Sequence, residues 1–217
     1  MSGVLRADRR LLSLAIALSG LAGFVDAVGF LSAGGFFVSF MSGNSTRLAV
    51  ALGTDADGAL RAASLIGGFV IGVMLGGIMG HMAGRARRPA VLAMVTGLLT
   101  IGAIAGAAWP GLAIAAMVLA MGAENAALAD NGEVRVGVTY MTGALVRLGN
   151  AAANRLCGRT AGAWHVDLGL WCGLTGGAIG GALAYAALHL AALWIAAALA
   201  AALTLAALAI GRPGRAG

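Results

Sequence analysis

The sequence predicts an all-α integral membrane protein with six transmembrane helices in two inverted-topology repeats. Three observations predict it: the composition, the number of long apolar runs, and a motif that occurs twice. Of the 217 residues, 60% are hydrophobic and only 10% are charged, and the mean hydropathy is +0.94. Soluble domains carry about a quarter charged residues, so the composition excludes an ordinary soluble domain.

Six apolar runs are long enough to cross the hydrocarbon core of a membrane, about 30 Å, which takes roughly 20 helical residues. They cover residues 11–32, 62–82, 90–108, 112–129, 168–188 and 190–210. The first run is too long for the apolar region of a signal peptide, so we expect it to be retained. The runs and their loops account for nearly the whole chain, and we expect no soluble domain.

A polar motif occurs at the same place in both halves of the chain. The segment Ser39–Ala49 matches Thr139–Gly149, because methionine, a hydroxyl residue, glycine, arginine and leucine recur in register. The motif divides the chain into a first repeat, residues 1–108, and a second repeat, residues 109–217, each with three spans. Because three is an odd number, the second repeat enters the membrane in the opposite orientation, an architecture common among transporters.

Each motif segment, 34–54 or 136–154, is expected to contain a re-entrant or broken half-helix. The helical runs Ser45–Leu52 and Leu145–Asn154 are too short to cross, and irregular backbone at membrane depth is stable only where protein or water surrounds it. We expect the two helices to enter from opposite faces and to present free amide groups near the bilayer midplane. The alternative is a pair of amphipathic helices that lie in the headgroup region.

The starts of these two half-helices are the predicted solute-binding site. Hydroxyl and amide side chains accept hydrogen bonds from free N–H groups at a helix start, glycine permits the turn into the helix, and arginine adds a positive charge. An asparagine at comparable depth in the fourth span completes the set. The predicted binding residues are Ser42, Gly43, Asn44, Arg47, Asn125, Thr142, Gly143 and Arg147.

Two carboxylates lie inside predicted spans, Asp26 in the first and Glu124 in the fourth. A charged side chain at the centre of a bilayer costs about 2.5–3.5 kcal/mol on insertion scales, so such residues are functional candidates. We predict that Asp26 and Glu124 are proton-coupling groups. The alternative is that they are counter-charges for Arg47 and Arg147 and only hold the repeats together.

The distribution of arginine predicts the topology. All 14 basic residues are arginine, and the formal net charge is +6. If the N-terminus is cytoplasmic, every arginine except Arg47 and Arg61 lies on the inner side, which is the positive-inside pattern. We therefore expect both termini in the cytoplasm and no nucleic-acid partner.

Glycines spaced by four residues form smooth faces on the second and fifth spans. Small residues let helix backbones approach closely, so we expect these faces to pack within the chain or, alternatively, to form a homodimer contact. The glycines are Gly68, Gly72, Gly76, Gly80, Gly173, Gly177 and Gly181.

Each half also carries a longer signature that ends in the motif. The signatures are Gly23–Ala27 followed by Phe37–Asn44, and Met121–Ala126 followed by Val138–Gly143. Together they resemble the DUF1275 (YoaK-like, UPF0700) family of bacterial inner-membrane proteins over essentially the whole chain. Ser42 and Glu124 depart from that family, which usually has threonine and glutamine there. The resemblance implies an inner-membrane location but supplies no substrate.

The function predicted from these observations is transport of a small polar or anionic solute through a central site formed by the two half-helix starts, with or without proton coupling. The alternatives are a passive channel of the same architecture and, less favoured, a membrane-embedded enzyme or a scaffold. The sequence has no nucleotide-binding loop, no metal-ligand spacing and no nucleophile motif, so we expect no enzymatic activity, no cofactor and no metal. The expected partners are the lipid bilayer and the solute.

Overall fold

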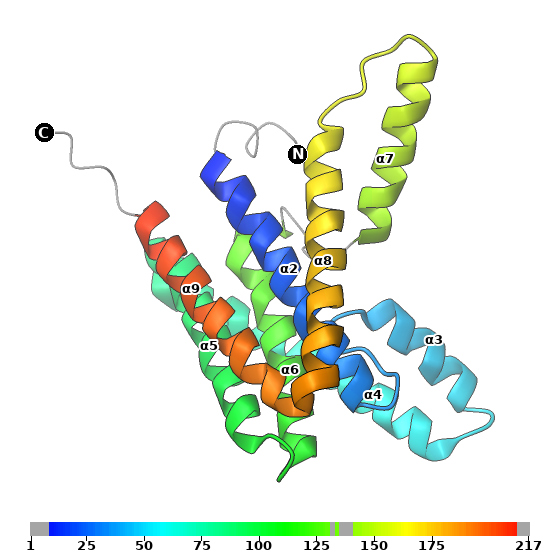
Figure 1. The fold of residues 1–217 in the computed structure, drawn as a ribbon, viewed down its shortest axis with the longest axis vertical. Coiled ribbons are helices and arrows are strands. Elements are labelled where there is room, and N and C mark those ends of the chain that lie inside the picture. Colours follow the sequence, from blue (N-terminus) through cyan, green and yellow to red (C-terminus); the bar gives the residue numbers. More distant parts are fainter. Residues whose placement is uncertain (1–8, 131–132, 135–140, 212–217) are drawn as a thin grey trace, which may run out of the picture.

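The computed structural model describes residues 9–130, 133–134 and 141–211, and these residues are almost entirely helical (Figure 1). Two-residue strands, β1 (Ala129–Asp130) and β2 (Glu133–Val134), form one short antiparallel pair. The α-helices are α2 (Arg9–Ser32), α3 (Met41–Ala51), α4 (Ala56–Ala83), α5 (Arg87–Ala105), α6 (Pro110–Glu124), α7 (Met141–Leu156), α8 (Trp164–Leu188) and α9 (Leu193–Gly211). The predicted all-α class is confirmed.

Four stretches of helix are long and apolar enough to cross a membrane in the described part of the chain. Two of them, Ala56–Ala105 and Trp164–Ile210, contain 50 and 47 residues. At 1.5 Å per residue, a continuous helix of that length would be about 70–75 Å long, far more than one crossing requires. Each is broken once by a left-handed residue, Gly84 with φ 53° or His189 with φ 49°. The four stretches therefore contain the six helices that the sequence predicts as spans.

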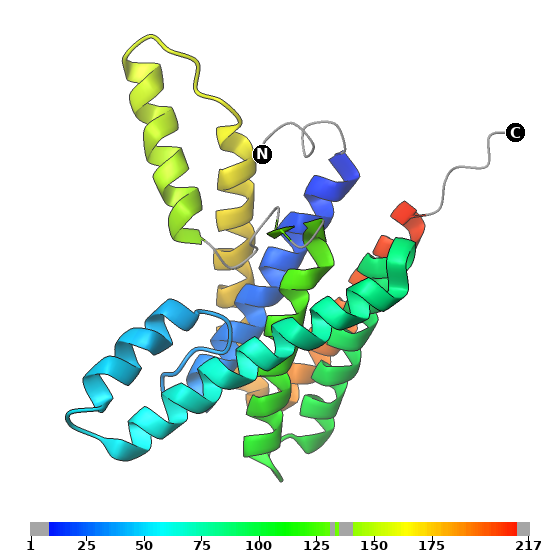
Figure 2. The same cartoon turned by 180° about the vertical axis from the view of Figure 1, so that it is seen from behind.

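The helices form three shells (Figures 1 and 2), and the buried apolar residues form two clusters. The inner shell is α2, α5, α6 and α9, which pack against one another. α4 packs on α6 and α8 packs on α2, and the outermost helices α3 and α7 pack on α4 and α8. The core between the inner helices includes Leu21, Val25, Val95, Leu99, Met117, Met121, Leu193 and Ala196.

Two helix crossings, α2 with α8 and α4 with α6, depend on glycine. At the first, Gly177 lies against the carbonyl of Gly20, and Gly181 lies against the carbonyl of Phe24. At the second, Gly72 lies against the carbonyl of Leu119. The other glycines of the two predicted faces also contact helices of the same chain, and Gly80 contacts the side chain of Arg87. The glycine faces therefore pack within one chain, as expected. The homodimer through the same faces stays a prediction.

Hydroxyl groups add hydrogen bonds between helices. Ser19 Oγ of α2 donates to the carbonyl of Leu170 on α8 at 2.9 Å, and the hydroxyls of Thr96 on α5 and Thr204 on α9 lie 3.2 Å apart. The outward faces are apolar, as expected for helices surrounded by lipid. Exposed examples are Val70, Met74, Ile78, Ile179, Leu183 and Leu205.

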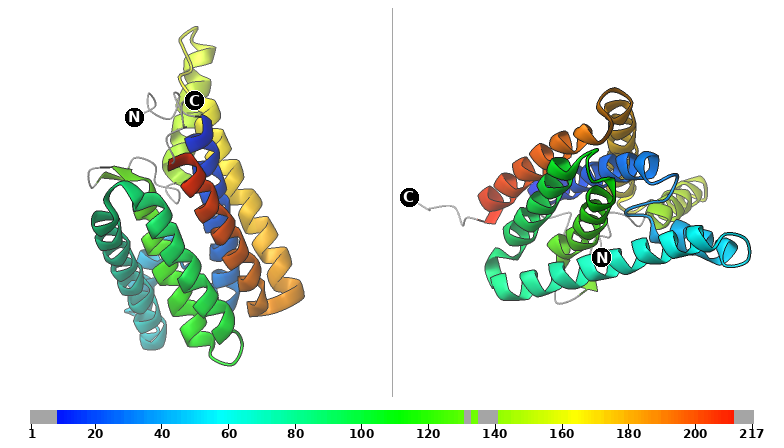
Figure 3. Two further views of the ribbon diagram at one scale, coloured as in Figure 1. Left: turned by 90° about the vertical axis from the view of Figure 1, so that its left-hand side faces the viewer. Right: turned by 90° about the horizontal axis from the view of Figure 1, so that it is seen from below.

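The chain segments that carry most of the arginines lie toward one end of the molecule. In the left view of Figure 3, the start of α2, the α4–α5 junction, the α7–α8 loop and the end of α9 point one way. The turns between α3 and α4, between α5 and α6, and between α8 and α9 lie toward the other end. The predicted charge asymmetry therefore corresponds to two separate ends of the fold.

We expect Gly177→Ala to destabilise the protein, because its new methyl group would overlap the Gly20 carbonyl and the backbone could relieve this only by separating α2 and α8. Overpacking of this kind costs about 1–3 kcal/mol, which corresponds to a Tm lower by roughly 2–10 °C. Gly176→Ala is the matched control, since a Cβ there meets nothing within 4 Å. Thermal unfolding of the two purified variants checks the prediction, and equal Tm values would contradict it.

Candidate functional site at the starts of α3 and α7

α3 and α7 lie on the same side of the bundle and point away from each other. In Figures 1 and 2, both begin near the middle of the molecule; α7 extends toward the end that carries the start of α2, and α3 extends toward the opposite end. α3 has 11 residues and α7 has 16, so the helices are about 16 and 24 Å long. Both are too short to cross a membrane.

Both helices begin at the motif methionine, Met41 or Met141, four residues earlier than the predicted runs. The hydroxyl residues Ser42 and Thr142 therefore lie in the first helical turn, and both are exposed. The predicted capping of α3 by its polar side chains is wrong, because the residue at the N-cap position is Phe40 and no side chain caps the turn. The backbone amide groups at the start of α3 therefore have no capping side chain.

Asp26 holds the loop that leads into α3. The Gly34 and Gly35 backbones turn the chain with φ of 68° and 86° at the end of α2, a conformation that suits glycine. The loop then returns to α2, where Asp26 Oδ1 accepts hydrogen bonds from the N–H groups of Val38 at 2.9 Å and Ser39 at 2.8 Å. This carboxylate therefore has a definite structural partner, the backbone of the motif loop.

Asn44 fixes the same loop from the other side. Its side chain is fully buried; Oδ1 accepts from the Phe37 N–H at 3.0 Å, and Nδ2 donates to the Phe37 carbonyl at 2.7 Å. This two-point bond replaces the pairing that a neighbouring backbone would supply. The equivalent residue in the second half is Ala144, which is also buried but cannot make such bonds.

Arg47 rests on the aromatic rings of this loop. Its guanidinium carbon lies 5.2 Å from the ring centre of Phe36, 5.8 Å from that of Phe37 and 5.9 Å from that of Phe30, distances typical of cation–π attraction. Gly43 makes room for the aromatic group, since a Cβ there would lie 2.6 Å from the Phe40 ring. The predicted role of Gly43 as a turn residue is wrong, because it lies within α3 and has no positive φ.

In the second half, Arg147 forms an ion pair with Asp167 at the start of α8. Arg147 Nη2 and Nε lie 2.7 and 2.8 Å from Asp167 Oδ1, which ties α7 to α8. Gly143 lies beside this arginine, with its Cβ position 3.3 Å from Nη1. Sequence reasoning missed Asp167. Its signal was available, because Asp167 is the last acidic residue of the chain and directly precedes a predicted span.

Glu124 and Asn125 lie where α6 ends and the 3₁₀ helix η2 (Asn125–Leu128) begins. Glu124 is 1% exposed and Asn125 is 6% exposed. Asn125 Nδ2 donates to the Met121 carbonyl at 2.9 Å. Both carboxylate oxygens of Glu124 and the Asn125 Oδ1 have no hydrogen-bond partner among the described groups. Part of the second motif segment, residues 136–140, lies outside the described residues.

The predicted site residues fall into three sets by what they contact. Asp26, Asn44 and Arg47 contact the loop Phe36–Ser39, Glu124 and Asn125 are buried where α6 ends, and Arg147 pairs with Asp167. Among the residues that the structure describes, no ion pair joins either carboxylate to either motif arginine, and no cluster of three or more His, Cys, Asp or Glu could hold a metal ion. The counter-charge of Arg147 is Asp167.

We expect Asn44→Ala to loosen the motif loop, because it removes both hydrogen bonds to Phe37 and leaves a partly buried N–H and carbonyl without these partners. Each such group costs about 1–3 kcal/mol. Hydrogen exchange at the Phe37 amide should become faster by at least roughly tenfold, since 1.4 kcal/mol corresponds to a factor of ten. Ser45→Ala is the control, because that exposed hydroxyl bonds only within α3. Unchanged exchange in Asn44→Ala would contradict the assignment.

Comparison with known proteins agrees with this architecture. The family described as "Protein of unknown function (DUF1275)" matches residues 14–206. The UPF0700 transmembrane protein RA0705 of Rhizobium meliloti (strain 1021) is 41% identical over 172 residues, which cover 79% of this chain and 75% of the relative. No solved structure matches the chain. With its two motif signatures, its apolar helices and this relative, the chain belongs to the DUF1275 (UPF0700) family of transmembrane proteins.

Proposed function

We propose that this membrane protein is a transporter built from two inverted repeats, which moves a small polar or anionic solute between the starts of α3 and α7. In this proposal α2, α4 and α5 are the spans of the first repeat, and α6, α8 and α9 are those of the second. α3 and α7 are the two half-helices. The observation that carries the proposal is the equivalence of the helix contacts in the two halves.

The equivalence extends to individual residues. A constant difference in residue number, that between Gly20 and Leu119, relates each residue of α2 to its equivalent on α6. A second constant difference, that between Gly72 and Gly177, relates α4 to α8 in the same way. Applied together, the two differences turn three glycine contacts of the α2–α8 crossing into three contacts of the α4–α6 crossing. The pairs of equivalent contacts are Gly177 on Gly20 with Gly72 on Leu119, Gly181 on Phe24 with Gly76 on Ala123, and Gly23 on Leu174 with Gly122 on Phe69.

The directions of the helices support inversion of the second repeat. α2 and α6 are equivalent, yet α2 begins at the end of the molecule where α6 finishes (Figure 1). α3 and α7 likewise extend toward opposite ends. Helix starts that converge at mid-depth form substrate and ion sites in transporters with inverted repeats. We infer that the bilayer midplane lies near Met41 and Met141.

The chemistry at these helix starts favours a polar or anionic solute. Arg47 rests on aromatic rings and pairs with no carboxylate in the described part of the chain, so its positive charge is available to a ligand. Ser42 and Thr142 are exposed donors in the first turns, and helix starts attract negative charge. Glu124 is the stronger candidate for proton coupling, because Asp26 is already bound to the backbone of the motif loop.

Orientation follows from the arginine distribution. The end that carries the start of α2, the α4–α5 junction and the α7–α8 loop faces the cytoplasm in this proposal, because positive loops remain inside. Both termini are then cytoplasmic and the membrane is the bacterial inner membrane. A compartment-sensitive reporter fused after Gly217 checks the orientation, and a periplasmic signal would reverse it.

We expect Arg47→Ala and Asp26→Asn each to lower uptake by proteoliposomes strongly while leaving insertion and folding intact, because Arg47→Ala removes the charge that binds the solute and Asp26→Asn weakens the two hydrogen bonds that hold the motif loop. A charge-assisted hydrogen bond contributes about 1.5–3 kcal/mol, so loss of Arg47 should weaken solute binding by roughly 10- to 100-fold. The solute is first identified by thermal stabilisation across a metabolite panel, since binding raises the apparent stability. Arg85→Ala in the α4–α5 junction is the control. Wild-type uptake in either variant would remove that residue from the mechanism.

A pH gradient across the same liposomes separates a transporter from a channel. A proton-coupled transporter concentrates the solute, whereas a passive channel only equilibrates it. Glu124→Gln should abolish gradient-driven accumulation and retain exchange of solute at equal concentrations. Accumulation that persists in Glu124→Gln would exclude Glu124 as the coupling group.

A further inference from the structure

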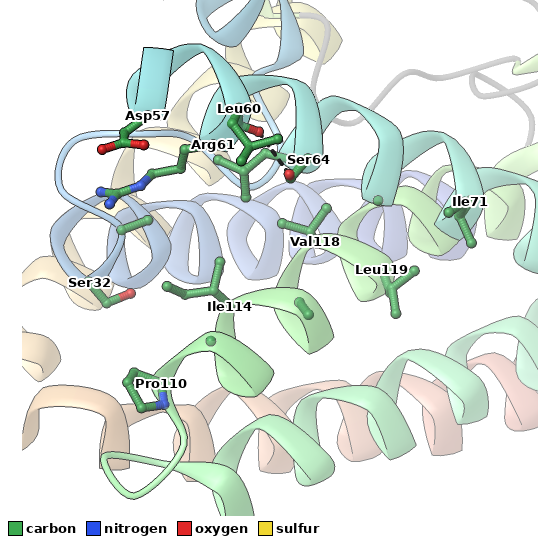
Figure 4. Close-up of a pocket in the computed structure, with 15 residues that line it drawn as sticks. Ser32, Asp57, Leu60, Arg61, Ser64, Ile71, Pro110, Ile114, Val118 and Leu119 are labelled. Atoms are coloured by element: carbon green, nitrogen blue, oxygen red, sulfur yellow. Dashed lines mark hydrogen bonds between the residues drawn. The ribbon is translucent and has the colours of Figure 1, made fainter. Parts of the chain in front are cut away.

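A cavity of about 910 Å³ lies between α4 and α6, next to the end of α2 (Figure 4). Its volume is within the range of roughly 300–1,000 Å³ that is typical of ligand sites. Its wall is mainly apolar and includes Leu60, Leu65, Ile71, Ile114, Val118 and Leu119. None of the residues of the proposed solute site lines it.

The cavity exists because the two otherwise equivalent glycine crossings differ at one end. α8 stays against α2 toward its start, where Gly169 contacts Ile16 and the Ser19 hydroxyl bonds the Leu170 carbonyl. On α4, the Cβ position of Gly68 meets only the side chain of Val118, at 3.1 Å, whereas that of the equivalent Gly173 on α8 meets the Ile16 backbone carbonyl. Toward the starts of α4 and α6, both helices line the open space.

The polar groups of the cavity are concentrated at this end. Figure 4 shows Asp57 and Arg61, one turn apart on α4, near Ser32 at the end of α2. The Arg61 guanidinium carbon lies 5.8 Å from the ring centre of Phe36, which fixes its position. A ligand that matches this site carries a negative and a positive group close together, followed by an apolar chain.

We propose that the cavity binds a phospholipid whose head group contains a phosphate and a primary ammonium, as in phosphatidylethanolamine. The phosphate pairs with Arg61, the ammonium donates hydrogen bonds to Asp57, and an acyl chain lies along the apolar wall. Leu60 and Ile71 are 69% and 52% exposed, so the cavity has an apolar entrance that a membrane lipid can cross. A quaternary ammonium has no N–H to donate to Asp57, and a head group without an amine leaves Asp57 unpaired.

Thermal unfolding of the purified protein in detergent tests this site with four probes: phosphatidylethanolamine, phosphatidylcholine, phosphatidylglycerol and free phosphoethanolamine. At about a hundredfold excess over Kd, we expect phosphatidylethanolamine to raise the Tm by roughly 5–10 °C. The other two lipids should give smaller shifts and phosphoethanolamine none. Equal shifts for all three lipids, or an equal shift with phosphoethanolamine, would overturn the proposal.

Substitutions in the cavity test whether the lipid raises the Tm by binding there. Arg61→Ala should abolish the shift in Tm, and Asp57→Asn should remove the preference for phosphatidylethanolamine over phosphatidylcholine. Gly111→Phe should place a ring in the cavity, since Gly111 lines it and its Cβ position meets nothing within 4 Å; Gly97→Phe on α5, whose Cβ position is equally open, is the control. Ala115→Phe is a second filling variant. A lipid shift that survives in a folded filling variant would overturn the proposal, whatever the uptake assays give.

Discussion

Direct contact between helix backbones is the constraint on which the rest of this fold depends. At the crossings of α2 with α8 and of α4 with α6, glycines lie against carbonyl groups of the neighbouring helix, where a methyl group would not fit. Between helices in lipid, close packing and hydrogen bonds replace the hydrophobic drive for association. These crossings position α4 and α8, and α3 and α7 pack on those two helices. The glycine faces therefore determine where the motif helices begin.

The two halves share contacts but use their polar residues differently. In the first half, Asp26 and Asn44 are bound to the backbone of the motif loop, and Arg47 rests on its aromatic rings. In the second half, Ala144 takes the position of Asn44, and Glu124 is buried with no hydrogen-bond partner among the residues that the structure describes. We infer that the first motif is stabilised by its own loop, whereas the carboxylate of the second half is free to take part in function.

Features that depend on neighbouring residues in the sequence could be predicted, whereas contacts between helices far apart in the sequence could not. Apolar length predicted the six long helices, and the repeated motif predicted two short ones, because both signals are local. The four-residue glycine spacing predicted that α4 and α8 pack closely against other helices. It did not predict which helices these are, because the contact of α8 with α2 depends on how the chain folds. Asp167 was missed because its partner Arg147 is on another helix. The sequence placed Arg61 on one side of the membrane but did not predict that it lines a cavity. The separation of α4 from α6 that opens this cavity has no signature in the sequence of either helix.

A shared solute site requires that α3 and α7 converge at their starts and diverge toward opposite ends. Pulsed electron resonance between pairs of spin labels measures both separations, with Cys157 and Cys172 first replaced by serine. Labels at Ser42 and Thr142 mark the two starts, and labels at Leu52 and Leu156 mark the two ends; all four positions are exposed. We expect a clearly shorter distance between the two starts than between the two ends. Starts as far apart as the ends would contradict the shared solute site.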